Sequence, residues 1–87
     1  MRGSRVTVTL TYPPPIIDLA GSRKLPDTTF QLRVRGVDGQ AFRLDASEDL
    51  ANWSLLTTDS FLGDVFDFVD TQATNFPARF YRVLPVR

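Results

Sequence analysis

The segment FQLRVRGVDGQAFRLDAS, residues 30–47, decides the fold of this chain. On both sides of a glycine-containing turn, apolar and polar side chains alternate with the period of two that is typical of a half-buried β-strand. Each strand therefore has one apolar face, which we expect to point into the interior. That face is expected to consist of Phe30, Leu32 and Val34 on the first strand and of Phe42 and Leu44 on the second.

Two arrangements of these strands are open. If they pair directly as a hairpin, both apolar sets must share one face. A loop of residues 37–39, whose glycine takes the left-handed conformation, meets that condition. Val34 then lies opposite Phe42, and Arg33 lies opposite Arg43. In the alternative, the two strands belong to different sheets.

Alternating or β-branched segments recur along the rest of the chain, and none has a helical period of useful length. Phe66 and Phe68 share one face of such a segment, so we expect them to join the same core. The further strands are expected at residues 5–12, 53–60, 64–70 and 79–86, with a short one near 16–19. Strands spaced about ten residues apart predict a small all-β sandwich or barrel.

The size and charge of the chain limit what it can be. With 87 residues it has room for one domain. The first four residues, MRGS, resemble an added leader, so residues 5–87 are expected to form that domain. Ten basic and ten acidic residues balance, whereas a nucleic-acid-binding domain usually has a clear basic excess. The N-terminal segment lacks the apolar run of a signal peptide or membrane span.

The residue types argue against catalysis and metal binding. The chain has no histidine and no cysteine, so it has no imidazole base and no thiolate or imidazole metal ligand. Three aspartates, Asp64, Asp67 and Asp70, occur close together. Along a strand, however, Asp67 faces away from the other two, which lie about 20 Å apart. We therefore expect no catalytic residue, no metal site and no cofactor.

The segment ASEDLANW is interpreted as a turn between two strands. Glu48 and Asp49 are adjacent, so their side chains diverge and do not form the facing carboxylate pair of a glycosidase. We expect Ser47 to cap the turn, Leu50 to enter the core and Asn52 to close the turn.

The chain's one tryptophan, Trp53, begins a strand. A large aromatic residue at that position belongs more often to the core than to a ligand site. The alternative is that Trp53 stacks on a sugar together with Tyr81.

Three outward-facing arginines, Arg33, Arg35 and Arg43, form a candidate interaction face for an anion or a partner protein. Two arginines directly opposite each other on paired strands cost stability unless something offsets them. Asp45, Asp67 or a carboxylate of the partner would do so.

The stretches FQLRVRGVDGQAFRLDASEDLANWSLLTT and FDFVDTQATNFPARFYRV together resemble a known bacterial module. That module is found at the C-termini of large secreted proteins of Verrucomicrobia and related bacteria, and it is similar to bacterial fibronectin type III-like domains. The resemblance covers about residues 28–84. It implies an antiparallel sandwich of the immunoglobulin or fibronectin type III kind, with about six or seven strands. In that topology the two strands of residues 30–47 lie in different sheets.

The resemblance also implies a function without catalysis. We expect a spacer, adhesion or assembly unit of a secreted or surface bacterial protein, located outside the cell or at its surface. The alternative is a carbohydrate-binding module attached to a secreted hydrolase. The expected partners are a protein, or a second copy through an edge strand, or a polysaccharide, with neither nucleic acid nor membrane insertion.

Residues 5–12, RVTVTLTY, alternate most cleanly of all. The fibronectin-like pattern ends at residues 79–86, which would leave that strand with an unpaired edge. We expect residues 5–12 to lie against this edge, either within one molecule or between two.

Overall fold

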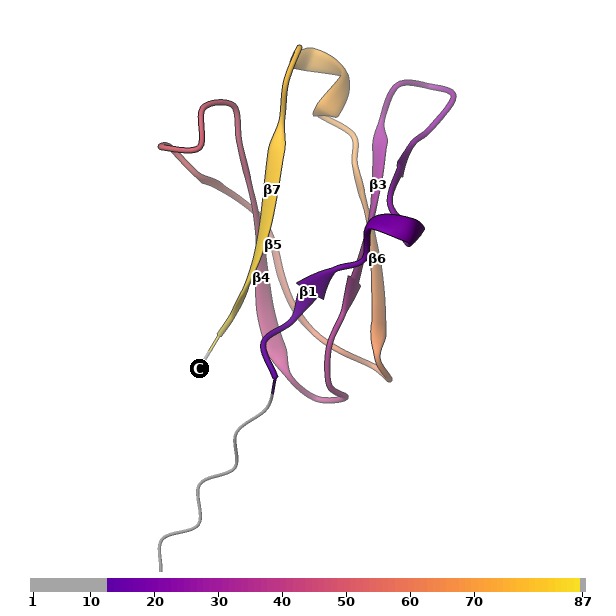
Figure 1. Cartoon of the computed structure of the whole chain (residues 1–87), viewed down its shortest axis with the longest axis vertical. Coiled ribbons are helices and arrows are strands. Elements are labelled where there is room, and N and C mark those ends of the chain that lie inside the picture. The colour runs from indigo at the N-terminus through magenta and orange to yellow at the C-terminus, as the bar shows by residue number, and fades with distance from the viewer. Residues whose placement is uncertain (1–12, 87) are drawn as a thin grey trace, which may run out of the picture.

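Two antiparallel β-sheets pack face to face in the computed structural model, which describes residues 13–86 (Figure 1). In sheet A, β3 (Phe30–Arg35) pairs on one side with β6 (Val65–Asp70) and on the other with the short strands β1 (Ile16–Ile17) and β2 (Arg23–Lys24). In sheet B, β4 (Ala41–Ser47) lies between β5 (Ser54–Ser60) and β7 (Phe80–Pro85). Two short 3-10 helices, η1 (Leu19–Gly21) and η2 (Ala73–Asn75), lie in the connections. The predicted small antiparallel all-β sandwich is confirmed.

Direct pairing of the two strands within residues 30–47 is wrong. β3 belongs to sheet A and β4 to sheet B. In β3, Arg33 lies opposite Asp67, and in β4, Leu44 lies opposite Val83. The alternation of side chains fixes which face of each strand is buried, but it does not fix the neighbouring strand. Two apolar faces that meet across the core satisfy the same pattern as two that lie side by side.

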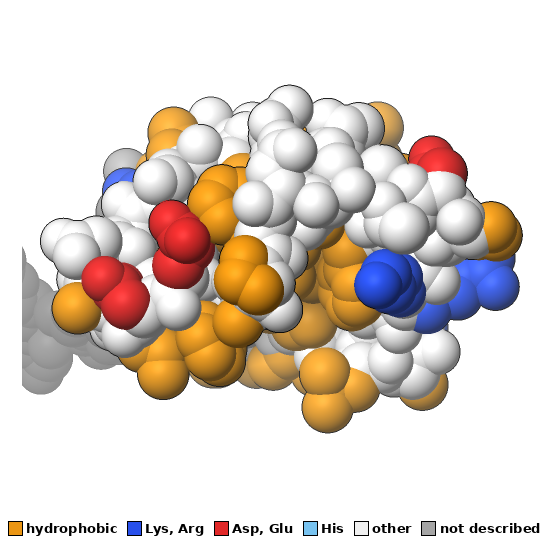
Figure 2. Space-filling view, turned by 90° about the horizontal axis from the view of Figure 1, so that it is seen from above, with side chains coloured by type: hydrophobic (Ala, Val, Ile, Leu, Met, Phe, Trp, Pro, Cys, Tyr) orange, Lys and Arg blue, Asp and Glu red, His pale blue; other side chains and the backbone are white. Residues whose placement is uncertain are grey.

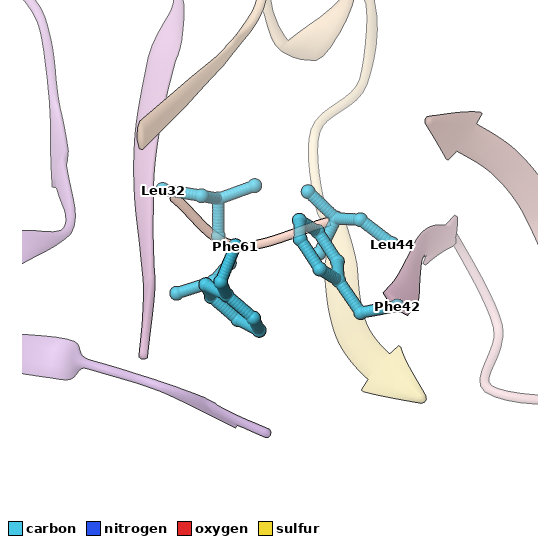
Figure 3. Close-up of a cluster of buried hydrophobic side chains, with 5 residues drawn as sticks. Leu32, Phe42, Leu44 and Phe61 are labelled. Atoms are coloured by element: carbon cyan, nitrogen blue, oxygen red, sulfur yellow. The ribbon is translucent and has the colours of Figure 1, made fainter. Parts of the chain in front are cut away.

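One core lies between the sheets, as the alternation predicted. Phe42 contacts two further rings, with centroid separations of 4.5 Å to Phe61 and 5.1 Å to Phe66. The fully buried side chains of the core cluster are Leu32, Val34, Phe42, Leu44 and Phe61 (Figure 3). Phe30, Phe66 and Phe68 are partly buried against it.

Phe61 is a core residue that the sequence pattern did not indicate. It follows β5, outside any alternating segment, and its backbone N–H donates to the carbonyl of Gln40 at 3.0 Å. A Cβ atom added at Gly36 would lie 2.2 Å from the Phe61 ring. Glycine at position 36 is therefore what lets the chain cross from β3 to β4 directly over this ring.

A β-bulge changes which side chains of β5 face the core. The pairing of β4 with β5 shifts register between Leu44 and Asp45, so that Thr57 pairs with Leu44 and Leu55 pairs with Asp45. Leu56 is the extra residue, and it packs against the core while Leu55 is exposed.

Sheet B ends at β7, and among residues 13–86 no strand is hydrogen-bonded to the outer edge of β7. In antiparallel pairs, opposite residues alternate between exchanging hydrogen bonds and exchanging none. Val86 N–H donates to the carbonyl of Ala41. The register of β7 on β4 therefore turns the backbone N–H and C=O groups of Tyr81 and Val83 away from β4.

The strand expected at residues 5–12 lies outside the described residues, so its position against β7 stays a prediction. Within residues 13–86, no helix is long and apolar enough to cross a membrane.

Candidate functional site

The three arginines of the expected interaction face do not form one cluster. Arg33 lies on sheet A and donates to Asp67, with its Nε 2.8 Å from Oδ1. The hydrogen bond from Arg33 lowers the pKa of Asp67 below its usual value. Arg35, also on sheet A, donates to Asp18 at 2.6 Å. Arg43 lies on sheet B, so the opposition of Arg33 and Arg43 that direct pairing required does not occur.

Arg43 belongs instead to an ion cluster on the outer face of sheet B. Asp45 is 0% exposed, and its carboxylate accepts from Arg43 at 2.9 Å and from Arg82 at 2.9 Å. The Arg82 guanidinium carbon lies 4.3 Å from the centroid of the Trp53 ring, a cation–π geometry. Alternation along RFYRV places Arg82 on the outward face. Only the register of β7 on β4 brings it opposite Asp45.

Trp53 and Tyr81 lie on opposite faces of sheet B. Trp53 is half-buried beneath Arg82 on the outer face, so it is not part of the core cluster that we expected it to join. Tyr81 faces inward, stacks on Phe30 with centroids 5.5 Å apart, and packs against the core. The two rings therefore do not make a shared platform for a sugar.

Removing the guanidinium from the Trp53 ring should expose it to solvent. We expect Arg82→Ala to increase the quenching of Trp53 fluorescence by acrylamide, because the arginine covers one face of the ring. Arg33→Ala, which removes an arginine from sheet A, serves as the control and should leave quenching unchanged. Equal quenching in all three proteins would contradict the stacked geometry.

The turn between β4 and β5 has the predicted hydrogen bonds. Ser47 Oγ accepts from the backbone N–H of Leu50 at 2.9 Å. Asp49 Oδ1 accepts from the N–H of Ala51 at 2.9 Å and of Asn52 at 2.8 Å, and the Asn52 side chain donates to Asp49 Oδ2. The interpretation as a capped turn closed by Asn52 is confirmed.

The expected burial of Leu50 is wrong. Its side chain is 60% exposed and its φ is 65°. The left-handed conformation, uncommon for a residue with a bulky side chain, turns Leu50 away from the core.

The hydrogen bonds to Asp49 predict a dependence of stability on pH. Hydrogen bonds from backbone N–H groups hold the pKa of Asp49 far below 3.8, and the bond from Asn52 has a larger effect than the bond from Ala51. A lowered folded-state pKa contributes stability above the unfolded-state pKa of about 3.9, and that contribution is lost as the pH falls below it. We expect carbon-13 NMR to show that Asp49 titrates below this value, and Asp49→Asn to flatten the acid side of the stability curve. Titration of Asp49 near 3.9 would contradict the turn geometry.

The three aspartates near β6 are in three different environments. Asp64 is exposed, Asp67 pairs with Arg33, and Asp70 is 2% exposed. Asp70 accepts from Arg79 Nε at 2.6 Å and from the Tyr81 hydroxyl at 2.8 Å. Burial, and then the hydrogen bond to Asp70, raise the pKa of Tyr81. Within residues 13–86, no three acidic side chains come together in a group that could hold a metal ion.

A groove lies at one end of the sandwich, beside the free edge of β7. Its volume is about 410 Å³, and Figure 2, which looks onto this end, shows hydrophobic side chains in the hollow between the loops. Arg79 lies over the Phe76 ring, 4.2 Å from its centroid. The residues that line the groove include Lys24, Thr28, Phe30, Phe76, Arg79 and Tyr81. We call this groove, together with the free edge of β7, the open flank.

Lys24 gives the groove a positive rim. Most arginines of the described residues pair with an aspartate, and these are Arg33, Arg35, Arg43, Arg79 and Arg82. Among residues 13–86, no carboxylate pairs with Arg23 or Lys24, the two residues of β2.

No protein-family model, curated protein or solved structure matches this chain. The features of the chain that bear on function are therefore the open flank and the ion clusters.

Proposed function

We propose that this chain is a non-catalytic structural module that joins protein chains through its open flank. It would serve as a spacer, adhesion or assembly unit of a secreted or surface bacterial protein. The observation that carries the proposal is the outer edge of β7, to which no strand of residues 13–86 is hydrogen-bonded, beside a groove lined by aromatic rings. An unpaired strand edge next to an apolar groove is the arrangement that proteins use to bind an additional chain.

The placement of charge supports a structural role. Four aspartates each bind at least one arginine, and they are Asp18, Asp45, Asp67 and Asp70. Most of these pairs join different strands or connections of the sandwich. These ion pairs connect elements of the fold, so we assign these side chains a role in stability.

Two features support the finer proposal of a fibronectin type III-like module of the verrucomicrobial kind. The strands of residues 30–47 lie in different sheets, as that topology requires. In addition, Tyr81 binds Asp70 at the far end of the β6–β7 connection. Immunoglobulin-like sandwiches have a comparable tyrosine near the start of the equivalent strand, although its hydroxyl bonds to the backbone and that of Tyr81 bonds to a carboxylate.

The proposal is tested with the pure protein by recording its NMR spectrum as its concentration rises from about 20 μM to about 1 mM, the range of weak protein association. We expect the signals of Lys24, Tyr81 and Val83 at the open flank to shift. Thr58 on β5 and Val69 on β6 should not shift, because they lie on other edges. A spectrum that does not change with concentration, or shifts confined to those other edges, would overturn assembly through the open flank.

A carbohydrate-binding module remains a second proposal, and its support comes from the groove rather than from Trp53. Phe30, Phe76 and Tyr81 line the groove together with Thr28. Aromatic rings with nearby hydroxyl groups suit a sugar, although Tyr81 is already stacked on Phe30. Titration with a soluble glucan oligosaccharide separates the two proposals. Saturable shifts at the groove would favour sugar binding, and a spectrum that does not respond to the oligosaccharide would overturn this second proposal.

A further inference from the structure

We propose that the groove of the open flank accepts the β4–β5 turn of a second copy of this chain. Leu50 of each copy would enter the groove of the other, with Glu48 beside Lys24, in a reciprocal two-fold dimer. This inference rests on the proposed function and names the partner of the same surface.

The turn presents an apolar side chain and is held by local hydrogen bonds. Leu50 is held in its left-handed conformation by the hydrogen bond from its N–H to Ser47, while Asp49 binds the N–H groups that follow. Holding a bulky residue in this conformation costs free energy, and such strained residues concentrate at functional sites. Here the result is a leucine side chain that is 60% exposed in a hydrogen-bonded turn.

The charges of the turn and the groove are complementary. Glu48 is exposed, and no basic side chain of the described residues pairs with it. Lys24 at the groove likewise has no carboxylate partner among the described residues. In Figure 2, acidic side chains dominate on the left of this end and basic side chains on the right, with the hydrophobic hollow between them. In the proposed dimer, Lys24 of a second copy lies beside Glu48, and Glu48 of the second copy lies beside Lys24.

The turn and the groove are neighbours on the same end of the sandwich. Phe76 and Arg79 line the groove, and they also line the smaller hollow that contains Glu48 and Asp49. These two residues therefore form a wall between the turn and the groove. A two-fold axis that crosses the end of the sandwich over this wall would bring each turn onto the groove of the partner. Such an isologous contact closes at two copies.

Charge reversal tests the reciprocal contact by sedimentation equilibrium. We expect the wild-type chain to form a weak dimer, and Glu48→Lys or Lys24→Glu alone to weaken it about tenfold or more, because each variant places like charges in both contacts. An equimolar mixture of the two single variants should restore dimerisation, since every contact in the mixed dimer again joins opposite charges. Single variants that associate like the wild type, or a mixture that stays monomeric, would overturn the inference.

Leu50→Ser tests the apolar part, with Leu62→Ser as a matched control because Leu62 is 92% exposed at another loop. We expect the first to prevent dimerisation and the second to leave it unchanged, with both variants folded by circular dichroism. The outcomes separate the inference from the proposed function. If association shifts the NMR signals of the open flank but is not weakened by the substitutions at Leu50 and Glu48, the inference alone is overturned. A chain that is monomeric up to about 1 mM overturns both.

Discussion

Replacing Phe42 with alanine is expected to lower the free energy of unfolding by about 3–5 kcal/mol. The Phe42 ring is fully buried between Phe61 and Phe66, at the point where the two sheets face each other. The substitution removes apolar contacts and leaves a cavity that the rigid strands on both sides cannot close. Urea denaturation of the variant and the wild type measures the difference.

Leu62→Ala is the control for this substitution. Leu62 is 92% exposed, so its truncation should change the free energy of unfolding by no more than about 0.5 kcal/mol. A loss for Phe42→Ala as small as that of the control would mean that the apolar faces of β3 and β4 do not meet in a core.

Asp70→Ala should destabilise the protein by about 3–5 kcal/mol, because it removes one partner of a buried ion pair. Arg79, whose side chain is 12% exposed, would keep its charge without a carboxylate, and the Tyr81 hydroxyl would lose its acceptor. Tyr81→Phe removes only the hydroxyl, so it should cost less, about 1–2 kcal/mol. The same urea titrations measure both variants.

The exposed Asp64 provides the comparison, because Asp64→Ala removes a carboxylate from the same part of the chain at the surface. We expect it to be nearly neutral. If Asp70→Ala were equally neutral, the buried cluster of Asp70, Arg79 and Tyr81 would not contribute to the stability of the fold.

Periodicity in the sequence was enough to predict the strands of the core and the faces that they bury. Leu32, Val34 and Leu44 are buried as the alternation requires, and Arg33 faces outward. Periodicity could not predict which strands are neighbours, because the same alternation fits a hairpin and a pair of facing sheets. The ionic partners of Arg33 and Arg43 depend on which strands are neighbours. Because periodicity does not give the neighbouring strands, it could not give these partners either.

Residues outside regular strands were harder to predict. Ser47 accepts a hydrogen bond from the local backbone and Asn52 donates to the Asp49 side chain, so the turn itself could be recognised from its residue types. The direction of Leu50 depends on a single backbone angle, for which the sequence gives no signal. Phe61 enters the core from the β5–β6 connection, outside any alternating segment, so periodicity gave no sign of it, and its contact with Gly36 is visible only in the structure.

β3 and β4 face each other from two sheets, and among residues 13–86 this arrangement leaves β7 at the end of sheet B beside the groove. The open flank exists only if this arrangement holds. Proton NMR tests it directly, because the α-protons of antiparallel residues that exchange no hydrogen bonds lie close together.

This arrangement of the sheets predicts strong nuclear Overhauser effects between the α-protons of Arg33 and Asp67, and between those of Leu44 and Val83. Both pairs alternate with pairs that exchange hydrogen bonds, so their α-protons face each other. A strong effect between the α-protons of Arg33 and Arg43 would instead show that the two strands form a hairpin, and it would contradict the arrangement of the sheets.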